Sequence, residues 1–199
     1  MGKKELDLRS LTGAGESMLR TIARLRFADD STERVLILIS TLGEMHVAKS
    51  LRVLVERGRS RRGKFESTLV AKTEENMYLS WPSMFEWLSS GFDLHIRGKG
   101  PAQAFESCIA MRNAIVHGDG RLTELQARSF APSVATRNDA VKKLGVHFVG
   151  NRVFMGEKTR ELVLQAARDF VIYFDAQLLA KYPELLGAVD VEPGVTKNR

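Results

Sequence analysis

Two side chains five residues apart, Arg112 and His117, carry the chemistry that this sequence suggests. A guanidinium is a permanent cation whose planar fork of N–H donors matches a phosphate or a carboxylate. An imidazole ordinarily titrates near neutral pH, so it can accept or donate a proton during a reaction. Together the two residue types suit a site that holds a phosphate and moves a proton beside it.

Both residues fall near the C-terminal end of a helix that we expect over residues 101–117. A proline at its start and Gly118 just past its end are typical of helix termini. An apolar stripe along this helix runs through Phe105, Cys108, Ile109, Ile115 and Val116. Arg112 lies on the same stripe, although burial of a guanidinium is costly unless it is paired. Two interpretations remain: a structural ion pair with a carboxylate such as Glu44, or a wet cleft against a second subunit, where Arg112 meets a phosphate.

The end of this helix decides whether the two side chains can act together. On an ideal helix a step of five residues turns by about 140°, so Arg112 and His117 diverge unless the last turn unwinds at Gly118. Asn113 lies about one turn before His117, and we expect it to hydrogen-bond the imidazole and set its tautomer. Asp119, just past the helix, is a second candidate for that role.

The rest of the chain predicts a mainly all-α fold, an antiparallel helical bundle of four to five main helices. Helical patterns cover residues 16–27, 31–56, 65–79, 80–91, 101–117 and 157–181. A small β-hairpin is expected over about residues 145–155, before the last helix, because Gly150-Asn151 is a two-residue turn signal. A connector of residues 119–145 precedes it. Glu44 falls on an apolar row of the second helix, where a core residue is expected.

The length of 199 residues and a hydrophobic content of 44% fit one domain, which we expect over residues 16–183. Residues 1–15 and 184–199 are expected to be a flexible N-terminus and a flexible C-terminal tail. No apolar run reaches the ~18–20 residues of a membrane span, and no secretion signal is evident. A single cysteine, Cys108, excludes an internal disulfide. We therefore expect a cytoplasmic protein with no membrane contact, no metal and no cofactor.

The formal net charge of +6 arises in residues 1–64, which hold 14 Lys/Arg against 8 Asp/Glu. Five cations lie within eight positions: Arg57, Arg59, Arg61, Arg62 and Lys64. Such a patch attracts phosphate backbones through counterion release, so these residues are candidates for RNA binding. A solvated loop is the alternative interpretation. His46, His95 and His147 show no metal-like spacing, and we assign them no role.

The segment Arg112-Asn113-Ala114-Ile115-Val116-His117 resembles the Arg-x4-6-His motif of HEPN-domain proteins, in the variant with a polar residue directly after the arginine. That family carries the motif near the end of its third core helix. The resemblance covers about residues 33–181, with its specificity in the residues around the motif, including the Gly118-Asp119-Gly120 segment. It implies metal-independent RNA cleavage by a homodimer whose paired motifs form one positively charged cleft.

Under this resemblance Arg112 holds the scissile phosphate, and His117 is the general acid or base at the ribose 2′-OH or the leaving 5′-oxygen. The implied products are a 2′,3′-cyclic phosphate and a 5′-hydroxyl. Glu44 matches a place where the family often has a polar residue facing the motif. The resemblance further implies a toxin-like or phage-defence ribonuclease, with an antitoxin or defence-complex protein as partner. The alternatives are a non-catalytic HEPN-like module that binds RNA or protein, and a structural helical dimer with an Arg112–Glu44 ion pair.

Overall fold

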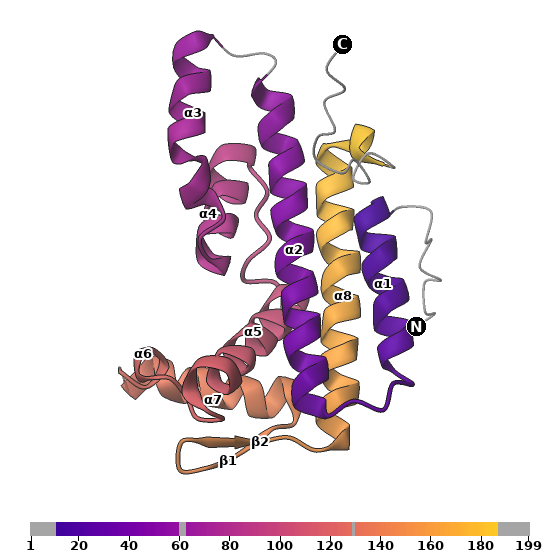
Figure 1. The fold of residues 1–199 in the computed structure, drawn as a ribbon, viewed down its shortest axis with the longest axis vertical. Coiled ribbons are helices and arrows are strands. Elements are labelled where there is room, and N and C mark those ends of the chain that lie inside the picture. Colours follow the sequence, from indigo (N-terminus) through magenta and orange to yellow (C-terminus); the bar gives the residue numbers. More distant parts are fainter. Residues whose placement is uncertain (1–10, 60–62, 129, 187–199) are drawn as a thin grey trace, which may run out of the picture.

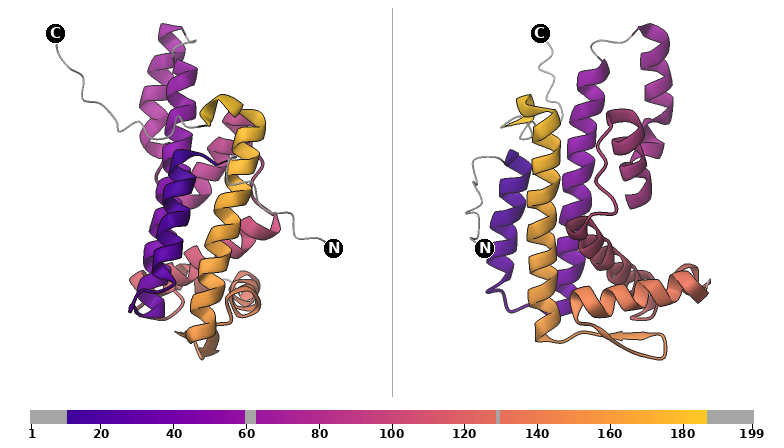
Figure 2. Two further views of the ribbon diagram at one scale, coloured as in Figure 1. Left: turned by 90° about the vertical axis from the view of Figure 1, so that its right-hand side faces the viewer. Right: turned by 180° about the vertical axis from the view of Figure 1, so that it is seen from behind.

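Three helices lie side by side and form the body of the fold (Figure 1). The computed structural model describes residues 11–59, 63–128 and 130–186. The three helices are α1 (Gly13–Leu25), α2 (Thr32–Arg59) and α8 (Glu157–Lys181). α2 and α8 run in the same direction, and α1 runs in the opposite direction (Figures 1 and 2).

Two further helices, α3 (Lys64–Met77) and α4 (Trp81–Phe92), form a helical hairpin beside the C-terminal half of α2 (Figure 1). The start of α4 matches the sequence expectation, because the Ser80 hydroxyl accepts a hydrogen bond from the Ser83 backbone N–H at 3.3 Å. Pro82 occupies the first turn of α4, where its missing N–H costs nothing. Asp93, in a left-handed conformation with φ 51°, ends α4.

The remaining elements gather mostly at the end of the molecule where α2 begins (Figure 1). They are α5 (Gly100–Gly118), α6 (Glu124–Ala127), α7 (Phe130–Leu144), β1 (His147–Val149), β2 (Arg152–Phe154) and, near the C-terminus, the short 3-10 helix η2 (Pro183–Leu185). β1 and β2 pair antiparallel across the turn at Gly150-Asn151. The expected mainly helical fold, with a small hairpin before the last helix, is confirmed.

α5 crosses α2 and α8 obliquely instead of running beside them (Figures 1 and 2), and it packs against both and against α7. The crossing depends on Gly43 of α2. A Cβ atom built there would lie only 2.2 Å from Cζ of Phe105 on α5. Any larger residue at position 43 would therefore push the two helices apart or force the ring out of its place.

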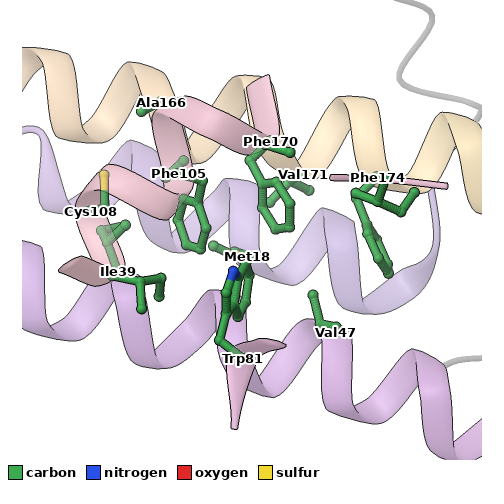
Figure 3. Packing of buried hydrophobic residues seen from close by; sticks show 14 of the residues in the cluster. Met18, Ile39, Val47, Trp81, Phe105, Cys108, Ala166, Phe170, Val171 and Phe174 are labelled. Carbon is green, nitrogen blue, oxygen red and sulfur yellow. The ribbon is translucent and has the colours of Figure 1, made fainter. Parts of the chain in front are cut away.

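An aromatic cluster fills the core at this crossing (Figure 3). The rings of Phe105 and Phe170 are stacked, with centroids 4.5 Å apart and an interplanar angle of 8°. Trp81 of α4 lies 5.5 Å from Phe105 and 5.6 Å from Phe170, measured between ring centroids. Aromatic pairs at such distances add packing energy beyond the area that they bury. The cluster thus joins α4, α5 and α8 over Gly43.

A buried carboxylate, Asp175 of α8, ties α1 and α2 to α8. Its Oδ2 accepts hydrogen bonds from the backbone N–H and the hydroxyl of Thr12, both at 2.9 Å. Its Oδ1 lies 2.8 Å from Nε2 of His46 on α2, which therefore donates to it. Gly15 leaves room for the carboxylate, since a Cβ there would lie 2.0 Å from Oδ2. Thr12 and Asp175 are fully buried and His46 is 3% exposed, so this histidine, given no role from sequence, is structural.

The ordered fold extends beyond the limits expected from sequence. Leu11 is buried, and Thr12 caps α1 because its hydroxyl accepts from the Gly15 N–H at 3.0 Å. At the other end Leu185 is fully buried. These contacts correct the expected domain limits of residues 16 and 183, while residues 1–10 and 187–199 lie outside the described residues. Among the helices described, none combines the length and the apolar composition required to cross a membrane.

The close approach at Gly43 yields a first prediction. Gly43→Ala should lower the free energy of unfolding by about 1–3 kcal/mol, because the added methyl overpacks the core against Phe105. Gly91→Ala is the matched control in α4: its Cβ would meet only Trp87 Cε3 at 3.5 Å, an ordinary contact. That variant should be as stable as the parent or slightly more so. Urea unfolding followed by circular dichroism measures both, and a Gly43→Ala protein as stable as the parent would contradict the packing described.

Candidate functional site

One face of the C-terminal third of α5 leaves the core while Ala114 stays buried, and the motif lies in this segment. Phe105 and Cys108 are fully buried, whereas Arg112 is half-buried. Further along, Val116 is 46% exposed and His117 is exposed. The apolar stripe predicted from sequence therefore emerges toward solvent along its length. The oblique course of α5 is the reason, because it carries this end away from α2 and α8 (Figure 1).

The Arg112 guanidinium has a polar neighbour but no carboxylate partner among the residues that the structure describes. Its Nη1 donates a hydrogen bond to Oδ1 of Asn113 at 3.0 Å. Its Nε is buried without an acceptor among the described protein atoms. Arg112 and Glu44 are both within the described residues, and they form no ion pair. The interpretation of Arg112 as one half of a structural pair with Glu44 is therefore wrong, and Glu44, half-buried on α2, bonds to no motif residue described.

α5 ends one residue later than the sequence suggests. Gly118 is still helical, and the left-handed residues are Asp119, with φ 51°, and Gly120, with φ 74°. The N–H groups of these two residues both reach the carbonyl of Ala114, Gly120 at 3.1 Å. An aspartate is one of the few residues besides glycine that adopt this conformation. The expected unwinding at Gly118 is wrong, because Asp119 and Gly120 together make the turn.

This ending keeps Arg112 and His117 apart. Both remain in regular helix, where five residues separate side chains by about 140° around the axis and roughly 7.5 Å along it. Asn113 is bonded to Arg112, so the expected Asn113–His117 hydrogen bond is not formed. Asp119 is exposed, and its carboxylate makes no hydrogen bond to His117 within the described residues. One chain therefore does not bring its own arginine and histidine together.

The loop that follows the motif is fastened to the β-hairpin. The Val153 N–H of β2 donates to the Gly120 carbonyl at 2.8 Å, and the Leu122 N–H donates to the Asn151 carbonyl at 3.0 Å. These bonds pair the loop with the hairpin as a short third strand would. The hairpin thus belongs to the same end of the molecule as His117, a proximity that sequence spacing does not reveal.

Positive charge gathers at this end as well. Residues 112–160 hold nine Lys/Arg and four Asp/Glu. The expectation from sequence placed the whole positive excess in residues 1–64. Counting along the chain hid the second concentration, because the flanking residues 65–111 and 161–199 together carry a compensating acidic excess. Folding separates the two groups and leaves the motif end cationic.

The RNA-binding segment predicted from sequence lies elsewhere. The C-terminal end of α2 and the N-terminal end of α3 lie at the opposite end of the molecule from the C-terminal end of α5 (Figure 1). There Arg57 pairs with Glu184 at 3.1 Å, and Lys64 is exposed. The other predicted members fall outside the described residues: the side chain of Arg59, and Arg61 and Arg62. This segment is therefore not part of the same site as Arg112 and His117.

The described residues give no support to a cysteine nucleophile or to a metal site. Burial raises the pKa of the Cys108 thiol to about 12, so it is no nucleophile near neutral pH. No three His, Cys, Asp or Glu side chains in the described ranges cluster as a metal site would need. A shallow pocket of about 410 Å³ lies between α4 and the segment that follows it, lined in part by Phe85, His95 and Arg97. It shares no residue with the motif.

The left-handed turn after α5 yields the second prediction. Gly120→Ala should lower the free energy of unfolding by about 1–2 kcal/mol, because an L-residue there is strained although the space around it is open. Gly118→Ala is the matched control, two residues away in regular helix, with an ordinary 3.4 Å contact to the Thr123 nitrogen. It should be neutral or slightly stabilising. Thermal unfolding compares the two, and the reverse order would place the helix end at Gly118 instead.

Comparison with known proteins identifies no relative: no protein-family model, no curated protein and no solved structure matches the chain.

Proposed function

We propose that the chain is a metal-independent endoribonuclease of HEPN type that acts as a homodimer. The observation that carries the proposal is the state of Arg112. It is half-buried at the end of α5, bonded through Nη1 to Asn113 and paired with no carboxylate in the described part of the chain. A guanidinium held at the edge of a core without an anion is stabilised when a phosphate supplies one. His117, exposed in the last turn of the same helix, adds a group that can transfer a proton.

The proposed reaction uses these two groups on an RNA phosphodiester. An imidazole takes the proton from the ribose 2′-OH, and the 2′-oxygen attacks the neighbouring phosphorus. Arg112 holds the phosphate and stabilises the negative charge that develops on its non-bridging oxygens. The bond to the 5′-oxygen breaks, and that oxygen takes a proton from an imidazolium. The products are a 2′,3′-cyclic phosphate and a 5′-hydroxyl.

The geometry of the single chain supports the proposed homodimer. Arg112 and His117 leave α5 in directions about 140° apart, so one chain does not close a site around one phosphate. A two-fold axis beside this helix end places a second arginine and a second histidine opposite the first pair. The exposed Val116 between them supplies apolar surface for such a contact. The proposal includes a toxin-like or phage-defence role, in which an antitoxin or a defence-complex protein restrains the enzyme.

A second candidate function is a non-catalytic module that binds RNA or a protein. The same divergence of Arg112 and His117 favours it, since a binding surface does not need both groups on one phosphate. Cleavage of RNA in the presence of a chelator separates the two functions.

The third prediction concerns the two motif residues. Arg112→Ala and His117→Ala should each lower the rate of RNA cleavage by about 100-fold or more, because each removes a group that acts in the transition state. A fluorescent single-stranded RNA, incubated with the protein and EDTA and resolved on a gel, measures the rates. His95→Ala is the control, because His95 is also an exposed histidine but lies outside the motif, after α4.

Circular dichroism and the elution volume on size exclusion should be the same for all of these variants. If both motif variants cut RNA at the parental rate, the catalytic assignment is wrong. If the parent itself cuts no RNA but binds it, the non-catalytic function replaces the first.

A further inference from the structure

The outer face of the β-hairpin carries an exposed set of aromatic, apolar and cationic side chains. Strand register pairs His147 with Phe154 and Val149 with Arg152, so these four residues share one face. All four are exposed: Val149 by 65%, Phe154 by 37%, and His147 and Arg152 also fall in the exposed class. We call this set the hairpin platform. The hairpin is the outermost layer at its end of the molecule (Figures 1 and 2).

The platform is ordered by its own contacts. The rings of His147 and Phe154 are stacked, with centroids 5.1 Å apart and an interplanar angle of 13°. The Arg152 guanidinium carbon lies 5.8 Å from the centroid of the Phe154 ring. A cross-strand aromatic pair stabilises a hairpin by itself, but that role does not require a cation over the ring or an exposed apolar neighbour.

The inner face of the hairpin is held rigidly by α7. The guanidinium carbon of Arg137 lies 5.0 Å from the centroid of the Phe148 ring, which points away from the platform. An Nη2 of the same arginine donates to Oδ1 of Asn151 at 3.1 Å and to the Gly150 carbonyl in the turn. One half-buried arginine therefore fixes both the inner ring and the turn. The platform is a preformed surface that pays little ordering entropy when it binds a ligand.

The platform is connected directly to the motif. Gly120, which accepts the Val153 N–H at 2.8 Å, comes three residues after His117. Arg121 forms an isolated antiparallel bridge with Arg152, so a second exposed arginine borders the platform. A chain lying on the platform is thereby led toward the C-terminal end of α5.

We propose that the hairpin platform binds single-stranded RNA and positions it for the motif at the end of α5. Exposed rings offer faces on which unpaired bases stack, and arginines beside them bind the phosphates and stack on bases in turn. The excess of nine Lys/Arg over four Asp/Glu in residues 112–160 favours a polyanion over an apolar protein partner. Duplex RNA is excluded by this mode, because its bases are already stacked inside the helix. The link to cleavage rests on the proposed function, but the binding itself does not.

The test measures the fluorescence anisotropy of a labelled 12-nucleotide single-stranded RNA titrated with the full chain carrying His117→Ala, which prevents cleavage under the proposed function. Phe154→Leu in this background should weaken binding at least about fivefold, because it removes a stacking face. Phe154→Tyr keeps the ring and should restore binding to the parental value. Arg152→Gln should weaken binding and make it less sensitive to salt, because one phosphate contact is lost.

Phe27→Leu is the matched control, because Phe27 is a phenylalanine that is 85% exposed in the connection between α1 and α2 and belongs to neither strand of the hairpin. It should bind as the parent does. Thermal unfolding confirms that each variant is folded. If Phe154→Leu is unfolded, Arg152→Gln decides the outcome alone.

The proposal is overturned if folded Phe154→Leu and Arg152→Gln bind the RNA as tightly as the parent, or if a duplex RNA binds as tightly as the single strand. Binding that is at least about fivefold weaker in Phe154→Leu, or weaker and less sensitive to salt in Arg152→Gln, supports the proposal. These outcomes are independent of the proposed function. If the unmodified chain cleaves RNA but the platform variants bind RNA normally, the ribonuclease proposal stands and the platform proposal fails. If the platform variants bind RNA weakly but the unmodified chain cleaves none, the platform proposal stands and the ribonuclease proposal fails.

Discussion

The close approach of α2 and α5 at Gly43 governs where the candidate site lies. Because position 43 has no side chain, the Phe105 ring enters the space that a Cβ would fill and stacks on Phe170. The crossing is therefore close, and the C-terminal third of α5 points away from α1, α2 and α8 (Figure 1). Arg112 consequently lies at the edge of the core and His117 in solvent.

Local patterns predicted much of the fold. The helix expected over residues 80–91 and the Gly150-Asn151 turn each depend on signals within a few residues of the chain, and each appears where expected. The direction of α5 was not predictable, because nothing in the sequence says that a glycine on α2 faces a ring on another helix. The hydrogen bond from Thr12 to Asp175 joins residues 163 positions apart, so the sequence did not predict it either.

At the candidate site, residue types were predictable and their relations were not. The motif does lie at the end of a helix, as expected. Its last turn stays regular because Asp119 accepts the left-handed conformation that the sequence assigns more naturally to Gly118. Asn113 turns to Arg112 instead of His117, and Glu44 reaches neither. The cationic segment after α2 lies far from the motif, while the hairpin, assigned no function from sequence, is hydrogen-bonded to the loop that follows the motif.

The proposed ribonuclease activity depends on a phosphate held by Arg112 and a proton transferred by His117 without a metal. The most direct measurement is the identity of the RNA ends after digestion with the unmodified chain in excess EDTA, determined by mass spectrometry. The proposed mechanism predicts fragments that end in a 2′,3′-cyclic phosphate and begin with a 5′-hydroxyl. Fragments with 3′-hydroxyl and 5′-phosphate ends, or RNA that stays full length, would contradict it.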